Sequence, residues 1–424
     1  MPFDAPRTGP RIAVIGAGVA GMTAAHFLAP QARVTLFEAE PRLGGHARTV
    51  RAGLDGAQPV DTGFIVFNYA NYPHLARLFQ DLDVPVARSD MSFGVSIDGG
   101  RLEYSFRSLQ ALLAQPANAA RPGFLRMLRD IHRFNAQAEA RAVEGQTVGD
   151  LTRALGLGDW FRRCYLRPIC GAIWSTPETE IDAYPARTLV DFFRNHGLLG
   201  LNGHHQWWTV QGGSVEYVRR LETRLIRDGV RIETGAPVRA VARDEDAATL
   251  HFSDRPSERF DEVVLACHSD DALRLLARPT PAESRALGAV RFRPNRVVLH
   301  RDPRQMPLRR ACWSAWVYRS TRQVSGPGVG VTYWMNRLQN IPETDPLFVS
   351  MNPADEIPEA LIYDETVFRH PVFDQDAVRA QSQIAALQGQ NRTWFAGAWL
   401  RNGFHEDGVA SALRIARRLA PAPA

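Results

Sequence analysis

The chain has 424 residues, of which 45% are hydrophobic and 22% are charged. This length and this balance predict a folded protein with a sizeable core and exclude intrinsic disorder for most of the chain. All 50 residues counted as lysine or arginine are arginine, because the sequence contains no lysine. Enzymes that need a lysine Schiff base, and phosphate-binding loops that need a lysine, are therefore excluded. The net charge of +5 permits an anionic partner without requiring one.

The four cysteines show neither a CxxC pair nor a spacing to histidine that is typical of zinc. The sequence therefore predicts no disulfide framework and no metal site. No apolar run is long enough to cross a membrane as a helix, and the first residues lack the basic and apolar segments of a signal peptide. We expect a cytoplasmic protein, and nothing in the sequence predicts a nucleic-acid partner or an oligomeric state.

A glycine motif follows the first predicted strand. The apolar run at 12–15 leads into GxGxxG, a predicted helix comes next, and a second predicted strand ends at Glu38. This order is typical of a dinucleotide-binding βαβ unit. Gly16 permits the tight turn, Gly18 lets the backbone approach a pyrophosphate, and Gly21 lets the helix pack on the strand. Glu38 is placed to accept hydrogen bonds from ribose hydroxyls. The predicted dinucleotide contacts are Gly16, Ala17, Gly18, Val19, Ala20, Gly21 and Glu38.

Two further turns follow Glu38. They read Arg42-x-Gly44-Gly45-His46 and Asp61-Thr62-Gly63-Phe64-Ile65. The first resembles the second pyrophosphate-binding element of the FAD-dependent amine oxidase and carotenoid desaturase superfamily, although His46 stands where arginine is usual. The second resembles the superfamily's segment beside the isoalloxazine ring. The resemblance implies FAD rather than NAD, bound without a covalent bond. It implies cofactor contacts from Arg42, Gly44, Gly45, His46, Asp61, Thr62, Gly63, Phe64 and Ile65.

The C-terminal end supports the same cofactor. Residues 394–397 predict a strand, and a predicted helix follows that begins between His405 and Asp407. The amides at the N-terminus of such a helix favour a bound anion. In the superfamily this helix points at the pyrimidine edge of the flavin. The resemblance implies contacts from Gly397, Asp407, Gly408 and Val409, and from Val238, where the superfamily places a valine against adenine. Asp407 stands where the superfamily commonly has glycine.

The resemblance implies an α/β fold built from a discontinuous Rossmann-type FAD-binding domain and an inserted α+β substrate domain, as in amine oxidases. We assign 1–75, 207–285 and 386–424 to the first domain, and 76–206 and 286–385 to the second. The first insertion is mostly helical by pattern, and the second carries strand-like runs. Aromatic residues are concentrated in the insertions, where each one either lines a pocket or belongs to an ordinary core. The predicted substrate contacts are Trp174, Tyr333, Trp334 and Phe404.

Four segments, at 170–177, 192–199, 333–340 and 402–408, carry a closer resemblance. They resemble a bacterial branch of flavoproteins that is similar to the oxidase-like N-terminal part of plant cyclopropane fatty acid synthases. The resemblance covers nearly the whole chain and implies dehydrogenation of a methyl-branched fatty acyl chain, either free or phospholipid-borne. Two alternatives stay open. One is an amine oxidase, although many of these use a lysine that this chain lacks. The other is a non-catalytic flavin-binding or lipid-binding partner of a lipid methyltransferase.

Dehydrogenation of an alkyl chain requires a proton acceptor as well as a hydride acceptor, so a base is expected near the flavin. The candidates beside the predicted flavin helix are His405 and Glu406, and His46 and His268 are further candidates. Structural alternatives exist, because His405 can pack or cap and Glu406 can simply favour a helix N-terminus.

Residues 123–134 form an amphipathic pattern if they are helical. Phe124, Leu128 and Ile131 lie on one side, and Arg126, Arg129 and Arg133 lie on another. Two interpretations stay open for this helix and for the tryptophan-bearing segment at 198–208. Both segments touch an anionic membrane surface, or both pack on the substrate domain.

Overall fold

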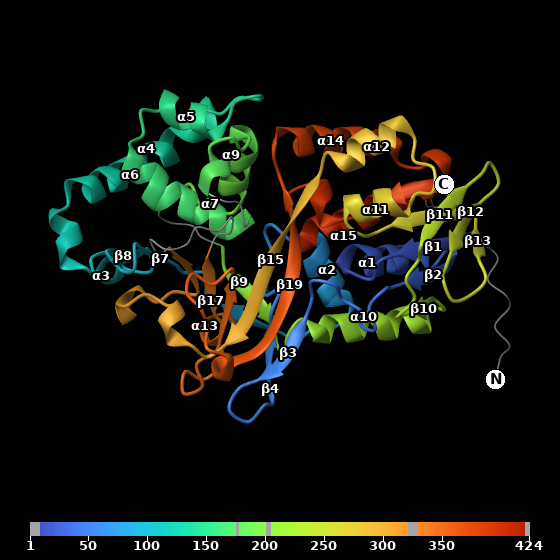
Figure 1. Ribbon diagram of the computed structural model, residues 1–424, viewed down its shortest axis with the longest axis horizontal. Helices are drawn as coiled ribbons and strands as arrows, with labels where there is room; N and C mark the ends of the chain where they lie inside the picture. Colours follow the sequence, from blue (N-terminus) through green and yellow to red (C-terminus); the bar gives the residue numbers. More distant parts are fainter. Residues whose placement is uncertain (1–8, 175–177, 201–204, 321–329, 420–424) are drawn as a thin grey trace.

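The computed structural model describes residues 9–174, 178–200, 205–320 and 330–419. A five-stranded parallel sheet with helices on both faces forms one half of the molecule, on the right in Figure 1. The strand order is β10-β2-β1-β14-β20, with bounds Arg231–Glu233, Arg33–Phe37, Arg11–Ile15, Glu262–Leu265 and Thr393–Phe395. Because these strands come from separate parts of the chain, the predicted discontinuous Rossmann-type α/β fold is confirmed.

The central strands of this sheet are mostly apolar because alternate residues pack into two different cores. Ile12 and Val14 face one core, and Ala13 and Ile15 face the other. The first core is covered by α1 (Val19–Leu28), α2 (Pro73–Asp81), α10 (Val215–Arg227) and α15 (His405–Leu419). The second core is covered by α11 (Ser269–Leu275), α12 (Pro281–Gly288), α14 (Gln375–Leu387) and the antiparallel sheet of β11 (Ala240–Arg243), β12 (Ala248–His251) and β13 (Glu258–Phe260).

A seven-stranded mixed sheet forms the centre of the other half. Its order is β19-β15-β18-β17-β16-β7-β8, with bounds Ile362–Val372, Arg291–His300, Phe348–Met351, Val331–Trp334, Trp316–Arg319, Phe93–Ile97 and Leu102–Ser105. The parallel pair of β16 and β7 joins the two inserted segments, and the other neighbours are antiparallel. The first insertion is therefore less purely helical than its sequence pattern predicts, because two of its strands complete a sheet begun elsewhere.

Helices surround the sheet of this second half, most of them above it in Figure 1, and two small sheets lie between the halves. The helices are α3 (Leu109–Leu112), α4 (Pro122–Arg141), α5 (Val148–Ala154), α6 (Asp159–Phe161), α7 (Arg167–Trp174), α8 (Glu178–Ile181), α9 (Ala186–Asn195) and α13 (Met335–Leu338). The small sheets are the hairpin of β3 (Thr49–Ala52) and β4 (Gln58–Asp61), and a sheet of β5 (Val66–Phe67), β9 (Trp207–Val210) and β6 (Val86–Ser89).

Helix α4 contains the amphipathic pattern at 123–134, and its apolar face is turned inward. Phe124 and Ile131 are buried in the core of the second half, together with Met127. Arg126 and Arg129 are exposed, and Arg133 donates a hydrogen bond to the backbone oxygen of Leu155. The interpretation in which this face lies in a membrane is therefore wrong, because the same side chains already form the protein core.

The second segment proposed for a membrane surface, 198–208, lies partly outside the described residues, which omit 201–204. Its two tryptophans begin β9, where Trp208 packs edge-on against Tyr69 and Trp207 against Tyr72. No helix in the described part of the chain is long and apolar enough to cross a membrane.

Candidate active site

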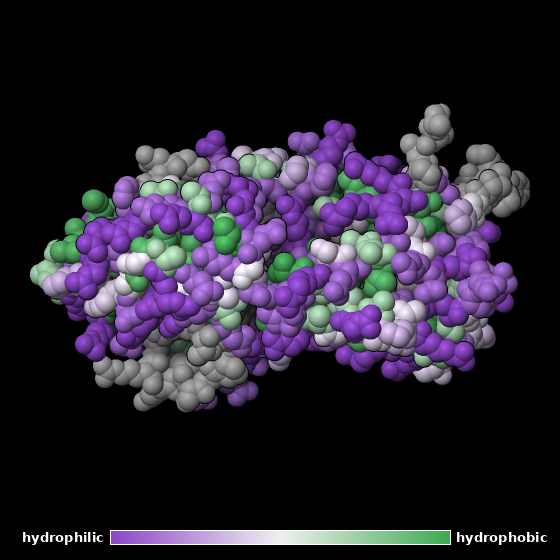
Figure 2. Space-filling model, turned by 90° about the horizontal axis from the view of Figure 1, so that it is seen from above, coloured by the Kyte–Doolittle hydropathy of each residue, from purple (hydrophilic) through white to green (hydrophobic). Residues whose placement is uncertain are grey.

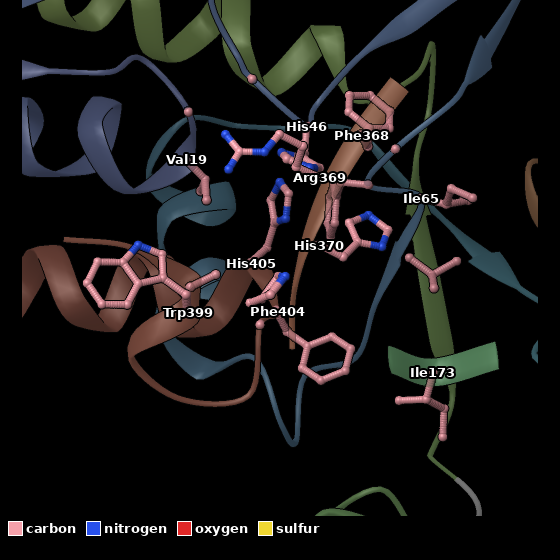
Figure 3. Close-up of a pocket in the computed structure, with 18 of the residues that line it drawn as sticks. Val19, His46, Ile65, Ile173, Phe368, Arg369, His370, Trp399, Phe404 and His405 are labelled. Carbon is pink, nitrogen blue, oxygen red and sulfur yellow. The ribbon is translucent and has the colours of Figure 1, made fainter. Parts of the chain in front are cut away.

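A large cavity of about 1600 Å³ lies between the parallel sheet and the seven-stranded sheet. One end is lined by Gly16 and Glu38, at the carboxyl ends of β1 and β2, where open α/β sheets bind their ligands. The other end is a chamber between α7, α9 and the mixed sheet, lined by residues such as Ile173 and Tyr333. Figure 3 shows Val19 and Trp399 on one side of the cavity and Ile65, Ile173 and Phe404 on the other.

The three motif glycines have different local environments. Gly16 has a φ of 102° and lies so close to β14 that an added Cβ would be 2.8 Å from the Ala266 oxygen. An added Cβ at Gly21 would lie 1.7 Å from the Gly16 oxygen, so only glycine lets α1 pack this closely on β1. An added Cβ at Gly18 would meet no atom within 4 Å, because it would project into the cavity.

Glu38 lies at the edge of the cavity and is held there by backbone amides. Its Oε2 accepts a hydrogen bond of 2.7 Å from the Ala17 amide, and its Oε1 accepts one of 2.9 Å from the Glu40 amide. Each oxygen keeps a second lone pair for a hydroxyl group. Val238 lines the same end, since the chain after β10 is bonded back to Glu38 through the Ala236 amide. Ala17 itself does not line the cavity, and it orients Glu38 instead.

The second glycine turn lies directly against the first. The Gly44 amide donates a hydrogen bond of 2.8 Å to the Ala17 oxygen, and an added Cβ at Gly45 would lie 3.1 Å from the Gly18 Cα. Gly44, with a φ of 102°, and Gly45, with a φ of 55°, hold the turn. Arg42 donates to the Gly45 oxygen at 2.9 Å and lines the cavity. The two turns and the first residues of α1, Val19 and Ala20, therefore form one cradle at the N-terminus of a helix, which suits a pyrophosphate.

The segment at 61–65 runs along the second turn. The Phe64 amide bonds to the His46 oxygen at 2.9 Å, and an added Cβ at Gly63 would lie 2.0 Å from that oxygen. Thr62, Gly63, Phe64 and Ile65, which are predicted cofactor contacts, line the cavity. Asp61 does not. Its carboxylate is buried and accepts hydrogen bonds from Thr49, Ser214 and Gln339, so it fixes this segment rather than contacting a ligand. Burial raises the pKa of Asp61 to about 6.

The N-terminus of α15 approaches the cavity with Phe404 and His405, but the two acids that follow point elsewhere. Both Glu406 oxygens accept backbone amides of α2, from His74 at 3.1 Å and Leu75 at 2.9 Å. Asp407 accepts the Phe404 amide at 3.0 Å and the Asn402 amide at 3.2 Å. Glu406 therefore caps α2 and Asp407 shapes the turn before α15. Neither lines the cavity, which overturns Glu406 as a candidate base and Asp407 as a cofactor contact.

Two other predicted contacts on α15 position the helix instead. An added Cβ at Gly408 would lie 2.8 Å from a methyl group of Val19, and Val409 is fully buried in the core beside α1. Gly408 and Val409 thus set the spacing between the two helices that border the cradle. Gly397, another predicted cofactor contact, lines the cavity, and its amide is held by the Ser411 hydroxyl at 3.0 Å.

Four histidines meet in the middle of the cavity, His46, His268, His370 and His405. The His46 ring lies 5.9 Å from that of His268 and 5.8 Å from that of His370, and Figure 3 shows His46, His370 and His405 close together. Desolvation lowers the pKa of His46 and His268 to about 4 and that of His370 and His405 to about 3. All four rings are therefore neutral at pH 7. His405 is additionally stacked on Phe64 and bonded to the Tyr217 hydroxyl at 3.1 Å.

His268, Asp270 and Asp271 are close enough together to hold a metal ion, but both carboxylates already bind arginine. Arg369 on β19 contacts both aspartates, and Arg274 also pairs with them. These ion pairs link the mixed sheet to α11 across the edge of the cavity.

The chamber beyond the histidines is mainly apolar, although Asp90, Asn135 and His196 also line the cavity. The aliphatic and aromatic residues that line it include Ile65, Val66, Met91, Phe93, Ile131, Tyr165, Ile169, Ala172, Ile173, Phe192, Leu198, Trp316, Tyr333 and Phe404. Of the four predicted substrate contacts, Tyr333 and Phe404 line the cavity, whereas the two tryptophans do not. Trp174 is buried against Tyr184 and Phe192, and Trp334 belongs to a separate cluster with Trp313 and Phe348.

The sequence reasoning assigned no role to His196, which lines the chamber at the end of α9. Its Nδ1 lies 2.9 Å from the Phe192 oxygen. A carbonyl oxygen can only accept, so Nδ1 carries the proton and Nε2 carries the lone pair. Nε2 makes no hydrogen bond to a described residue, and desolvation lowers the pKa of His196 to about 4. His196 lies within the segment 192–199, and the resemblance of this segment to the bacterial flavoproteins is the sequence signal that includes it.

Comparisons with known proteins agree with this geometry. Residues 19–420 match the profile of the family described as flavin-containing amine oxidoreductases. Among solved structures, a cyclohexylamine oxidase from Brevibacterium oxydans is 19% identical with a TM-score of 0.70, covering 97% of this chain and 99% of its own. A putative protoporphyrinogen oxidase from Exiguobacterium is 16% identical with a TM-score of 0.69, covering 97% and 98%. A fatty acid isomerase from P. acnes is 15% identical with a TM-score of 0.68, covering 96% and 98%.

At these identities the likeness concerns the fold. The search of curated protein sequences found no match to the chain.

The glycine geometry yields a matched pair of variants. Gly18→Ala places a methyl group in the cavity, so the protein should fold normally and bind flavin at least about tenfold more weakly. Gly21→Ala forces a methyl group onto the Gly16 oxygen, so the protein itself should lose stability. Flavin absorbance per protein and the melting temperature separate the two effects. A Gly18→Ala protein with full flavin, or a Gly21→Ala protein with an unchanged melting temperature, would contradict the assigned roles.

The neutral histidines predict acid sensitivity. In the unfolded chain these rings titrate near 6.5, whereas desolvation holds the pKa near 3 or 4 for His46, His196, His268, His300, His370 and His405. The unfolded state therefore binds more protons below pH 6.5, and stability should fall as the pH drops from 6.5 toward 4. Asp61 and Asp407, with pKa values raised to about 6, act in the opposite direction, as do Glu262 and Glu406, whose pKa values burial also raises, but these carboxyl groups are fewer than the six histidines. Melting temperatures between about pH 7.5 and about pH 5 provide the test, and a rise toward acid pH would refute it.

Proposed function

Because the chain belongs to the family of flavin-containing amine oxidoreductases and is an FAD-dependent oxidoreductase, we propose that its substrate is a methyl-branched fatty acyl chain. The reaction is dehydrogenation of a carbon–carbon bond of that chain. The apolar chamber at the inner end of the cavity is the observation that carries the proposal, because an alkyl chain offers no polar group for recognition and is bound through apolar surface.

The residues of the cavity fit FAD. The cradle formed by the two glycine turns and the N-terminus of α1 would hold the pyrophosphate, and Arg42 adds a positive charge beside it. Glu38 would bind the ribose hydroxyls next to Val238. Gly63, Gly397 and the N-terminus of α15 border the part of the cavity that leads into the chamber. When bound, the flavin supplies an acceptor for hydride.

The protein's own contribution is to hold the chain and to take up a proton. Walls of Ile173, Phe192 and Phe404 exclude water and restrict the orientation of an alkyl chain. Dehydrogenation also removes a proton from the carbon next to the one that donates the hydride. We assign the uptake of this proton to Nε2 of His196, a ring nitrogen in the chamber. The hydrogen bond from Nδ1 to the Phe192 oxygen leaves the lone pair of the ring on Nε2. His405 stays a second candidate, although its Nε2 is engaged with Tyr217.

The described part of the chamber has no carboxylate available to bind an ammonium group, which argues against a cationic amine as the substrate. The acidic residues that line the cavity are Glu38, Glu40, Asp90 and Asp271. Asp90 pairs with Arg337 at 3.3 Å, Asp271 pairs with Arg369, and Glu40 pairs with Arg42 at 3.1 Å. Among the described residues, the chamber thus offers no unpaired carboxylate to an ammonium group. One of the similar structures is a fatty acid isomerase, so another protein of this fold acts on a fatty acid.

The proposal predicts which compounds reduce the bound flavin. Anaerobic mixing with methyl-branched fatty acids, or with phospholipids that carry them, should bleach the flavin absorbance, whereas straight-chain lipids and a panel of amines should not. Reduction by amines instead would establish an amine oxidase. A flavin that no lipid or amine reduces would favour a non-catalytic partner of a methyltransferase.

Removing the lone pair of His196 should slow the reduction of the flavin. For His196→Gln we expect a loss of about 10²-fold or more in the bleaching rate with unchanged substrate binding. The wild-type rate should be independent of pH above about 6 and should decline toward the pKa near 4 as Nε2 becomes protonated. His132→Gln, on the exposed side of α4, is the matched control. Equal rates in both variants would remove His196 from the mechanism.

The flavin should be released by acid. Neither His46 nor His405, the two histidines that could form a covalent bond to the flavin, stands in a recognised attachment signature. Precipitation of the protein with acid should therefore leave the yellow colour in the supernatant. Colour that stays in the pellet would demonstrate a covalent bond.

A further inference from the structure

The cavity reaches the surface of the protein at the start of α3. Phe106 and Arg107 both line the cavity and are both exposed, Phe106 to 40%. The Phe106 ring lies 5.7 Å from that of Tyr165, which lines the chamber further in. This point is therefore a mouth that connects the apolar chamber to the outside.

An apolar patch adjoins the mouth. Leu109 is 65% exposed and Leu113 is 41% exposed. The Leu113 amide donates to the Leu109 oxygen at 3.1 Å, so the two side chains lie one helical turn apart and on the same side. With Phe106 they place three large apolar side chains in water within eight residues. We call Phe106, Leu109 and Leu113 the mouth patch. On the left of Figure 2, at this end of the molecule, exposed hydrophobic residues lie among hydrophilic ones.

The charge around the mouth patch is positive. Arg107 forms no ion pair with a described residue, and the polar contacts of Arg121 are to neutral oxygens of Arg101, Gln115 and Asn118. The nearest acid on β8, Glu103, is buried and paired with Arg309 at 2.9 Å. Apolar side chains flanked by unbalanced arginines suit the surface of an anionic bilayer, where the former enter the acyl region and the latter meet phosphates.

We propose that the mouth patch and Arg107 dock the protein on an anionic phospholipid bilayer, so that a lipid chain passes from the bilayer into the cavity. The passage of the chain rests on the proposed function, whereas the docking does not. The surface differs from the apolar face of α4, which is packed inside the protein. A second copy of the chain could cover an apolar patch of this kind, but the unbalanced arginines would then face each other, so an anionic surface is the better partner.

The test is sedimentation of the FAD-loaded protein with vesicles of phosphatidylcholine, with and without phosphatidylglycerol. The wild type should bind the anionic vesicles, and binding should weaken as salt is added. Leu109→Ser with Leu113→Ser should bind at least about tenfold more weakly. Arg107→Gln should lose part of the binding and show a smaller effect of salt. The control is Ile226→Ser with Arg227→Gln, an exposed apolar and basic pair on α10 in the other half of the molecule.

Several outcomes would overturn the proposal. The proposal is wrong if the wild-type protein does not bind anionic vesicles at low salt, or if it binds neutral and anionic vesicles with equal affinity. It is also wrong if the leucine double variant binds anionic vesicles as tightly as the control variant. A change in oligomeric state in that variant, without a change in vesicle binding, would assign the patch to a second copy instead. Flavin content should be unchanged in all variants and shows that they fold. Because sedimentation needs no turnover, failure to dehydrogenate an acyl chain would leave the docking result standing.

Discussion

The close packing of α1 on β1 fixes the geometry on which the rest of the site depends. Because Gly21 has no side chain, the helix starts directly over the end of the strand, and its first amides open into the cavity. The second glycine turn then rests on the first through the bond from Gly44 to Ala17. The segment at 62–65 rests in turn on that second turn through His46. A contact between three backbone segments thus determines where a flavin can lie.

Helix α15, near the other end of the chain, borders the same cavity because a glycine again permits close packing, here between two helices. Gly408 lets it approach Val19 on α1, and Glu406 ties it to the N-terminus of α2. A buried carboxylate that accepts two backbone amides is stable because its hydrogen bonds replace those lost to water, even though burial raises its pKa. The acids of α15 therefore serve the fold, and His405, which precedes them, is left to face the cavity.

The sequence predicts those parts of the structure in which one residue type satisfies one backbone requirement. Three features leave direct local signals in the sequence: glycines in a positive-φ turn or at a close approach, an acid at the end of the second strand, and apolar runs buried on both faces. The fold follows from these signals. Glu406 and Asp407 show where such reasoning fails. Their position at a helix N-terminus is visible in the sequence, but the direction of each side chain depends on α2 and on the turn at 402–404, which the local sequence does not define.

The residues that line the chamber are even harder to predict from the local sequence. Trp174 and Trp334 are large and aromatic like Tyr333, yet only Tyr333 lines the cavity, because the choice depends on how β17 is placed between β16 and β18. Strand β7 from the first insertion must pair with β16 from the second before the chamber has a wall at all. Residues so far apart in sequence carry no shared local pattern, and the desolvation that keeps His196 neutral arises only when the chamber is assembled around it. The polar cradle can therefore be derived from short motifs, whereas the apolar chamber, which determines the substrate, is a property of the assembled tertiary structure.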